Sequence, residues 1–140
     1  MKGREAWRNV GRATPAEAYE TVMWACDRGD LDVLVEAFVL SDAQKTEADR
    51  VFNKLPEDSR PKYGTPERMM ALLFASGTPA DIQPISAVIA GPEDTIVRAR
   101  VWNDRKGETN ELELPFHRYP DGWRVIVPQW QMNKSLAKLK

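Results

Sequence analysis

The chain has 140 residues, 42% of them hydrophobic, which is enough for one ordinary domain with a single hydrophobic core. Its 21 acidic and 20 basic residues leave a formal net charge of −1, so we expect no nucleic-acid partner, and no apolar run is long enough for membrane insertion. The single cysteine, Cys26, excludes an internal disulfide and a multi-cysteine zinc site, and the sequence predicts neither a metal nor a cofactor.

Residues 1–13 show neither helical nor strand periodicity and are predicted to form an N-terminal arm. A single α+β domain is predicted over residues 14–128, and a C-terminal tail, helical or frayed, over residues 129–140. The arm lacks an apolar signal core. We therefore expect a soluble chain, either cytoplasmic or an exported fragment whose signal lies outside this sequence.

The first predicted helix begins at Thr14, an N-cap residue that is followed by Pro15 and, three residues after the cap, by Glu17. Gly29 ends the helix, because glycine tolerates the left-handed conformation at a helix C-terminus. The apolar side of this helix comprises Ala18, Tyr19, Val22, Met23, Ala25 and Cys26.

Two further helix starts follow closely. Asp30 caps a second predicted helix that runs to about Leu40. Ser41 and Gln44 form a capping-box pattern that begins a third helix, and Pro56 stops it.

Residues 56–64 hold two prolines and a glycine among charged residues and are predicted to form a surface loop. Thr65 opens a fourth helix that ends before Gly77. Four apolar side chains of this helix are predicted to face the sheet as a pocket wall: Met69, Met70, Leu73 and Phe74. The alternative, that they are ordinary core residues, stays open.

After the fourth helix the hydrophobic period changes to two, which predicts a four-stranded antiparallel sheet. Pro84 favours an edge position or a bulge in the first strand. The predicted strands are Ile82–Ala90, Thr95–Trp102, Thr109–Tyr119 and Trp123–Pro128.

One register of the second hairpin places opposite charges together on one face and apolar pairs on the other. Under regular pleating, Trp123 would share the charged face, so either a bulge flips the last strand or both faces are partly covered. The predicted pairs are Arg98 with Glu113, Arg100 with Glu111, Ala99 with Leu112, and Val97 with Leu114.

Three segments resemble the nuclear transport factor 2-like superfamily. Residues 14–19 (TPAEAY) and 26–32 (CDRGDLD) are similar to its first two helices, which meet at a Gly-Asp corner. Residues 119–126 (YPDGWRVI) are similar to its last hairpin, where an Asp-Gly turn precedes a Trp-rich strand. Many members have a short hairpin between the second and third helices, whereas residues 41–55 here predict a helix.

The resemblance implies a cone-like α+β fold in which a curved sheet wraps around the helices and leaves a pocket at the wide end. Members include enzymes, binding modules and dimerisation domains, so the fold alone gives no activity. The leading hypothesis is a non-catalytic accessory or binding module, part of a larger bacterial protein, with a small apolar ligand or a protein as its partner.

An enzyme is the first alternative. His117, Glu113 and Tyr119 would project from the same face of a strand and could serve a small lyase or isomerase. The competing interpretation places them on the outer face beside the Arg–Glu pairs. The acid and tyrosine motifs of the steroid-isomerising members have no counterpart here.

Contact surfaces are the second alternative. Trp24 falls outside the apolar arc of the first helix, so either the arm covers it, through Trp7 or Val10, or a second protein does. A homodimer formed sheet to sheet would place Trp102 and Trp123 at the interface, with Arg98 and Arg100.

Overall fold

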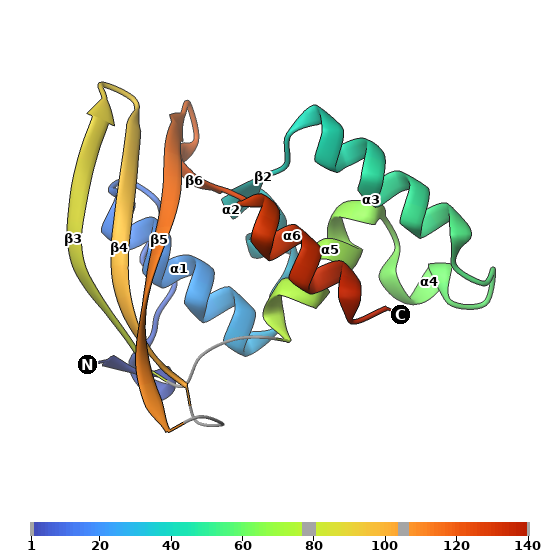
Figure 1. Ribbon diagram of the computed structural model, residues 1–140, viewed down its shortest axis with the longest axis horizontal. Helices are drawn as coiled ribbons and strands as arrows, with labels where there is room; N and C mark the ends of the chain where they lie inside the picture. The colour runs from blue at the N-terminus through green and yellow to red at the C-terminus, as the bar shows by residue number, and fades with distance from the viewer. Residues whose placement is uncertain (1, 77–80, 104–106, 140) are drawn as a thin grey trace.

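In the described part of the chain, six strands form one mixed sheet, and the helices pack against one of its faces (Figure 1). The computed structural model describes residues 2–76, 81–103 and 107–139. The helices are α1 (Pro15–Arg28), α2 (Leu31–Ala37), α3 (Asp42–Lys54), α4 (Arg60–Tyr63), α5 (Pro66–Ala75) and α6 (Gln129–Ala137), with a 3-10 turn, η1 (Arg4–Ala6). The strands are β1 (Lys2–Gly3), β2 (Phe38–Val39), β3 (Asp81–Gly91), β4 (Asp94–Asn103), β5 (Glu108–Tyr119) and β6 (Gly122–Ile126).

The predicted α+β class is confirmed, with one correction to the sheet. Strands β3, β4, β5 and β6 are antiparallel in chain order, as predicted. Two short strands extend this sheet, so that the full order is β1-β3-β4-β5-β6-β2. The sheet is mixed because β2 pairs in parallel with β6.

The same pairing shortens the second helix, which we expected to reach Leu40. Helix α2 ends at Ala37, and Phe38 turns to extended backbone opposite Val125. Phe38 is thereby buried in the sheet rather than on a helix face. The loop predicted over residues 56–64 contains the single-turn helix α4, and Gly77 lies outside the described residues.

The predicted helix starts are confirmed in their hydrogen bonds. The hydroxyl of Thr14 accepts from the Glu17 amide, and that of Ser41 accepts from the Gln44 amide, at 3.2 and 3.1 Å. Gly29 has φ +70° and ends α1 in the left-handed conformation. Each cap supplies a partner to a backbone group that the helix leaves unpaired, which is why these short polar residues fix the boundaries.

The predicted hairpin register is confirmed at all four pairs, Arg98–Glu113 and Val97–Leu114 among them. The charged pairs lie on the outer face, and Val97 and Ala99 are buried against the helices. Pro84 was expected to mark an edge position or a bulge, and a register shift against β4 follows it, in agreement with the second alternative.

The expected placement of the last strand was wrong. Tyr119 pairs with Gly122 across the two-residue turn Pro120-Asp121, so Arg118 faces Trp123 and Phe116 faces Val125. This register puts odd-numbered residues of β6 on the inner face with no bulge. Val125 is buried there with Phe116.

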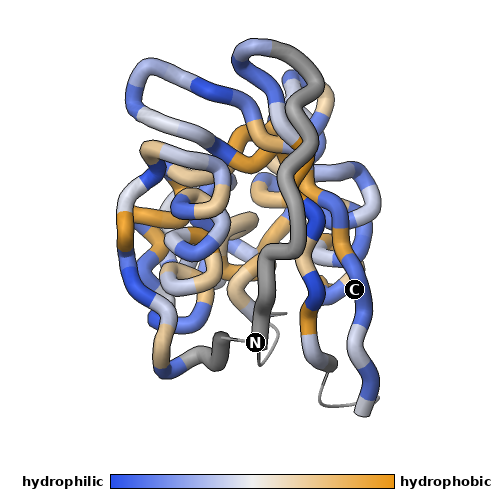
Figure 2. Tube along the Cα trace, turned by 90° about the vertical axis from the view of Figure 1, so that its left-hand side faces the viewer, coloured by the Kyte–Doolittle hydropathy of each residue, from blue (hydrophilic) through white to orange (hydrophobic). Residues whose placement is uncertain are grey.

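The terminal segments both pack on the body of the protein. Trp7 of the arm is completely buried, and the amide of Val10 donates to the hydroxyl of Thr21 on α1. Met132 of α6 is also completely buried. Figure 2 shows the hydrophobic stretches gathered in the interior and hydrophilic ones on the outer turns. Among the described residues, no helix is long and apolar enough to cross a membrane.

Candidate ligand-binding cavity

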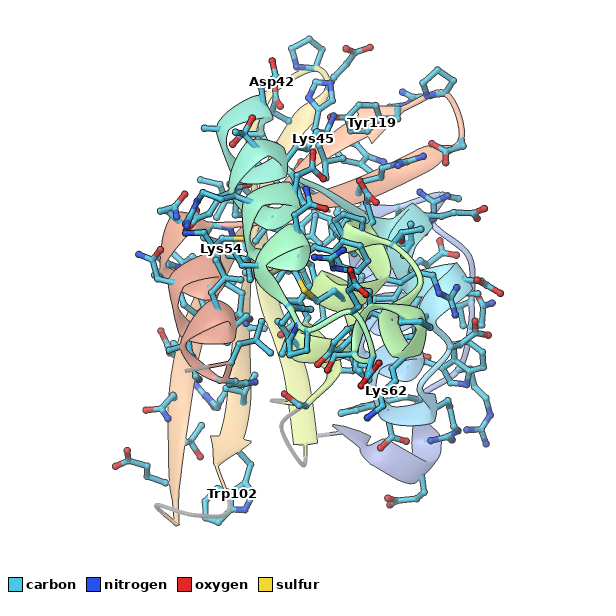
Figure 3. The ribbon with its side chains drawn as sticks, turned by 90° about the vertical axis from the view of Figure 1, so that its right-hand side faces the viewer. Asp42, Lys45, Lys54, Lys62, Trp102 and Tyr119 are labelled. Atoms are coloured by element: carbon cyan, nitrogen blue, oxygen red, sulfur yellow. The ribbon has the colours of Figure 1, made fainter. Side chains whose placement is uncertain are left out.

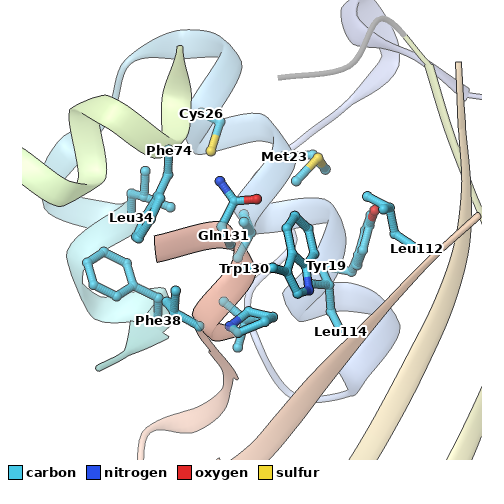
Figure 4. A pocket seen from close by; sticks show the side chains of 14 residues that line it. Tyr19, Met23, Cys26, Leu34, Phe38, Phe74, Leu112, Leu114, Trp130 and Gln131 are labelled. Carbon is cyan, nitrogen blue, oxygen red and sulfur yellow. The ribbon is translucent and has the colours of Figure 1, made fainter. Parts of the chain in front are cut away.

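A cavity of about 120 Å³ opens between α1, α6 and the inner face of the sheet (Figure 4). Helix α1 contributes Tyr19, Val22, Met23 and Cys26 to its lining, and the sheet contributes chiefly Leu112 and Leu114 of β5 and Val125 of β6. Phe38 and Phe74, which meet edge-on with ring centroids 5.3 Å apart, close one side. Trp130 and Gln131 of α6 complete the lining.

Helical and strand periodicity direct these side chains to one place. Tyr19, Val22, Met23 and Cys26 recur at spacings of three and four, so they share one face of α1. Leu112 and Leu114 alternate with Glu111 and Glu113, which point outward. The two leucines therefore point from the inner face of the sheet toward α1.

Two polar side chains, Gln44 and Lys138, hold α6 over the cavity with two hydrogen bonds each. At its N-terminal end, the amide of Gln44 donates to the Val127 carbonyl at 3.0 Å and to Gln129 Oε1 at 3.3 Å. At its C-terminal end, the ammonium of Lys138 donates to the Leu73 carbonyl at 3.0 Å and to Ser76 Oγ at 2.6 Å. The helix that carries Trp130 and Gln131 is therefore fixed at both ends.

Tyr19 is the buried polar residue of the cavity. Its side chain is only 1% exposed, and its ring packs against Phe116 with centroids 6.4 Å apart. Among the described residues, none donates a hydrogen bond to Tyr19 Oη or accepts one from it. Burial raises the pKa of Tyr19, and nearby Cys26 adds to the rise, so the hydroxyl stays protonated. A buried hydroxyl without a partner costs about 1–3 kcal/mol.

The rest of the lining is uncharged, and Gln131 contributes a polar side-chain amide to it. None of the described residues that line the cavity is a histidine, a carboxylate, a lysine or an arginine. Gln131 already donates through Nε2 to Ser135 Oγ at 3.1 Å. An ion placed here would lose its hydration without gaining a partner of opposite charge, so the cavity suits a neutral molecule.

The predicted pocket wall on α5 is divided between core and cavity. Phe74 lines the cavity, whereas Met69 and Met70 are completely buried in the core and are not among its lining residues. Leu73 is also buried and does not line it.

The predicted row of His117, Glu113 and Tyr119 lies on the outer face of the sheet. His117 Nδ1 is 2.6 Å from Asp94 Oδ1, and its ring meets that of Tyr119 edge-on, with centroids 4.8 Å apart. Glu113 accepts from the guanidinium of Arg98 at 2.9 Å. The sheet thus separates these three residues from the cavity, and none of them lines it.

The predicted interface tryptophans do not gather on one surface. Trp7 is buried inside the protein, and Trp24 is half-buried on α1. Trp102 alternates in step with Arg98 and Arg100, so it belongs to the outer face of the sheet. It lies near the tip of the β4–β5 hairpin, at the opposite end of the sheet from Tyr119 (Figure 3). Trp123 is two residues from Val125 on β6 and therefore belongs to the inner face of the sheet.

Sequence reasoning assigned Tyr19 and Cys26 to the core and did not single them out as cavity residues. The available signal was a tyrosine in an apolar helical arc, because a buried tyrosine hydroxyl usually needs a partner. Trp130 and Gln131 carried no such signal, since their placement depends on how α6 folds back.

No family model matches the sequence, and no curated protein matches it. Among solved structures, a Campylobacter jejuni protein described as a "putative NTF2-like transpeptidase" is similar, with a TM-score of 0.46 and 11% identity. The similarity covers 83% of this chain and 100% of that one.

Proposed function

We propose that this chain is a non-catalytic binding module whose cavity between α1, α6 and the sheet takes a small, largely apolar molecule. The observation that carries the proposal is the cavity of about 120 Å³ with its uncharged lining. As a measure of scale, an apolar cavity of about 150 Å³ in another protein holds benzene. A ligand of one ring or a short branched chain fits this space.

The position of the cavity supports binding from solution. Trp130 on α6 is 45% exposed and also belongs to the lining, so one aromatic side chain joins the cavity to the surface. Large apolar side chains at the rim of a concave site commonly contact ligands.

An enzyme of the lyase or isomerase type has less support. His117 is paired with Asp94 on the outer face, and Glu113 is paired with Arg98. Acid–base catalysis needs its groups within hydrogen-bond reach of a bound substrate, and the cavity lies on the other side of the sheet.

A thermal-shift screen of small neutral apolar molecules tests the proposal. A ligand at about a hundred times its dissociation constant adds roughly 2.7 kcal/mol to the free energy of unfolding, which raises the melting temperature by several degrees. We expect a shift with at least one compound of about six heavy atoms.

Variants that fill the cavity provide the specificity control. Leu114→Trp and, separately, Met23→Trp place a large ring in the cavity and should abolish the shift. Leu72→Trp is the matched control, because Leu72 is 43% exposed on α5 and does not line the cavity. No shift across the panel, or a shift that survives in both filled variants, would overturn the proposal.

A further inference from the structure

We propose that the cavity selects small neutral rings that carry a hydrogen-bond donor, and that the side-chain oxygen of Gln131 accepts that hydrogen bond. This inference rests on the proposed function and gives the chemical class of its ligand. It starts from one juxtaposition: an accessible amide oxygen, to which no described residue donates, belongs to the lining of an uncharged cavity.

The two polar atoms of the Gln131 side chain differ in what they bind. Nε2 donates to Ser135 Oγ at 3.1 Å, one turn further along α6, and this bond holds the amide in place. Oε1 accepts no hydrogen bond from a described residue and, unlike the sealed hydroxyl of Tyr19, it is accessible. Figure 4 shows the amide directed from α6 toward Met23 and Cys26 of α1. The lining therefore offers an acceptor to whatever occupies the cavity.

An acceptor on the wall defines the polar group of the ligand. A carbonyl oxygen of a glutamine side chain has two lone pairs and no proton, so it pairs with an N–H or an O–H and with no other oxygen acceptor. A ligand without a donor would cover Gln131 Oε1, displace its water and put nothing in its place. A ligand with a donor replaces that water.

The remaining walls define the body of the ligand. Aromatic rings from three elements border the cavity, namely those of Phe38, Phe74 and Trp130, and the hydrocarbon side chains of Leu112 and Leu114 face them. A flat ring of about five or six heavy atoms packs well against such rings and is within the size that a cavity of this volume holds.

Charge narrows the class further. An ammonium ion could also donate to Gln131, but it would lose its hydration where no described lining residue is a carboxylate. A carboxylate would bring negative charge beside the acceptor oxygen, with no cation among the described lining residues. The donor should therefore belong to a neutral group.

The test compares pyrrole with furan, two flat five-membered rings in which a ring N–H is replaced by an oxygen. Each is titrated by NMR into the wild type and into Gln131→Met, which keeps the length of the side chain and removes the amide. The readout is the ratio of the two dissociation constants, so that a general change in the cavity cancels. Gln129→Met, on the same helix but outside the lining, is the matched control, and Gln131→Leu is the second variant should the first fail to fold.

We expect Gln131→Met to weaken pyrrole relative to furan by roughly twofold to tenfold, the net worth of one hydrogen bond. Gln129→Met should leave the ratio at its wild-type value. A ratio that Gln131→Met and Gln131→Leu leave unchanged would overturn the role of Gln131 while the proposed cavity still stands. If neither ring binds, and no compound of the screen does, the proposed function fails as well.

Discussion

The amide of Trp123 donates to the carbonyl of Arg12 at 2.9 Å, which fastens the N-terminal arm to the beginning of β6. The guanidinium of Arg12 reinforces this link by donating to Asp121 at 2.8 Å and to the Trp123 carbonyl at 3.3 Å. The arm therefore crosses the last hairpin and continues directly into α1, the helix that supplies Tyr19 to the cavity.

The backbone of the arm packs tightly against Gly122 of the last hairpin. It has φ +129°, and a Cβ built there would lie 2.7 Å from the Arg12 carbonyl oxygen. We expect Gly122→Ala to lower the free energy of unfolding by at least about 2 kcal/mol, because backbone strain adds to a contact with main chain.

Gly107→Ala is the matched control for backbone strain alone. Gly107 has φ +63°, and a Cβ there would meet no described atom within 4 Å. Gly107→Ala should lower the free energy of unfolding by about 1–2 kcal/mol. Denaturant unfolding measures both variants. An equal loss of unfolding free energy in the two would mean that the arm makes no close backbone contact with the hairpin at Gly122.

Asp121 makes this end of the sheet sensitive to acid. Hydrogen bonds from Arg124, and then from Arg12, lower the pKa of Asp121 to about 2 from an ordinary value of 3.8. Because the folded-state pKa is depressed, the stabilisation is present above about pH 4 and is lost as the pH falls toward 2. The carboxylate is exposed, so the effect should stay below about 1 kcal/mol.

Thermal unfolding between pH 2 and 5 measures this contribution. Asp121→Asn should flatten part of the pH dependence of the melting temperature. Asp58→Asn, a change at another exposed carboxylate, controls for the loss of charge alone. A pH profile that Asp121→Asn leaves unchanged would contradict the assignment.

Trp7 anchors the arm in the core. Its side chain has no exposed surface, so Trp7→Ala should cost about 3–5 kcal/mol through lost burial and the cavity left behind. Trp130→Ala, at a side chain that is 45% exposed, should cost clearly less, about 1–2 kcal/mol, because less burial is lost. Similar losses in the two variants would show that the arm is not part of the stable fold.

The sequence predicted those features that depend on neighbours along the chain or on one hairpin. Thr14, Gly29 and Ser41 mark helix ends through contacts within a few residues, and the Arg98–Glu113 pair fixes a register across one turn. Such local rules could be read without the rest of the fold.

Features that depend on distant partners could not be predicted. The helix expected to reach Leu40 ends early because Phe38 pairs with Val125, far along the chain. The predicted pocket wall comprised Met69, Met70, Leu73 and Phe74, but of these only Phe74 lines the cavity. The way α5 and α6 pack buries the other three and brings Trp130 to the wall. Helical periodicity identifies the buried side of a helix, but it does not show which of the buried residues border a cavity.

The unpartnered hydroxyl of Tyr19 should cost the free protein stability. Tyr19→Phe removes the polar group and keeps the ring against Phe116, so we expect the free energy of unfolding to rise by about 1–3 kcal/mol. Tyr119→Phe is the matched control, because Tyr119 is only partly buried and water can reach it, and it should change little. Denaturant unfolding without added ligand measures both variants.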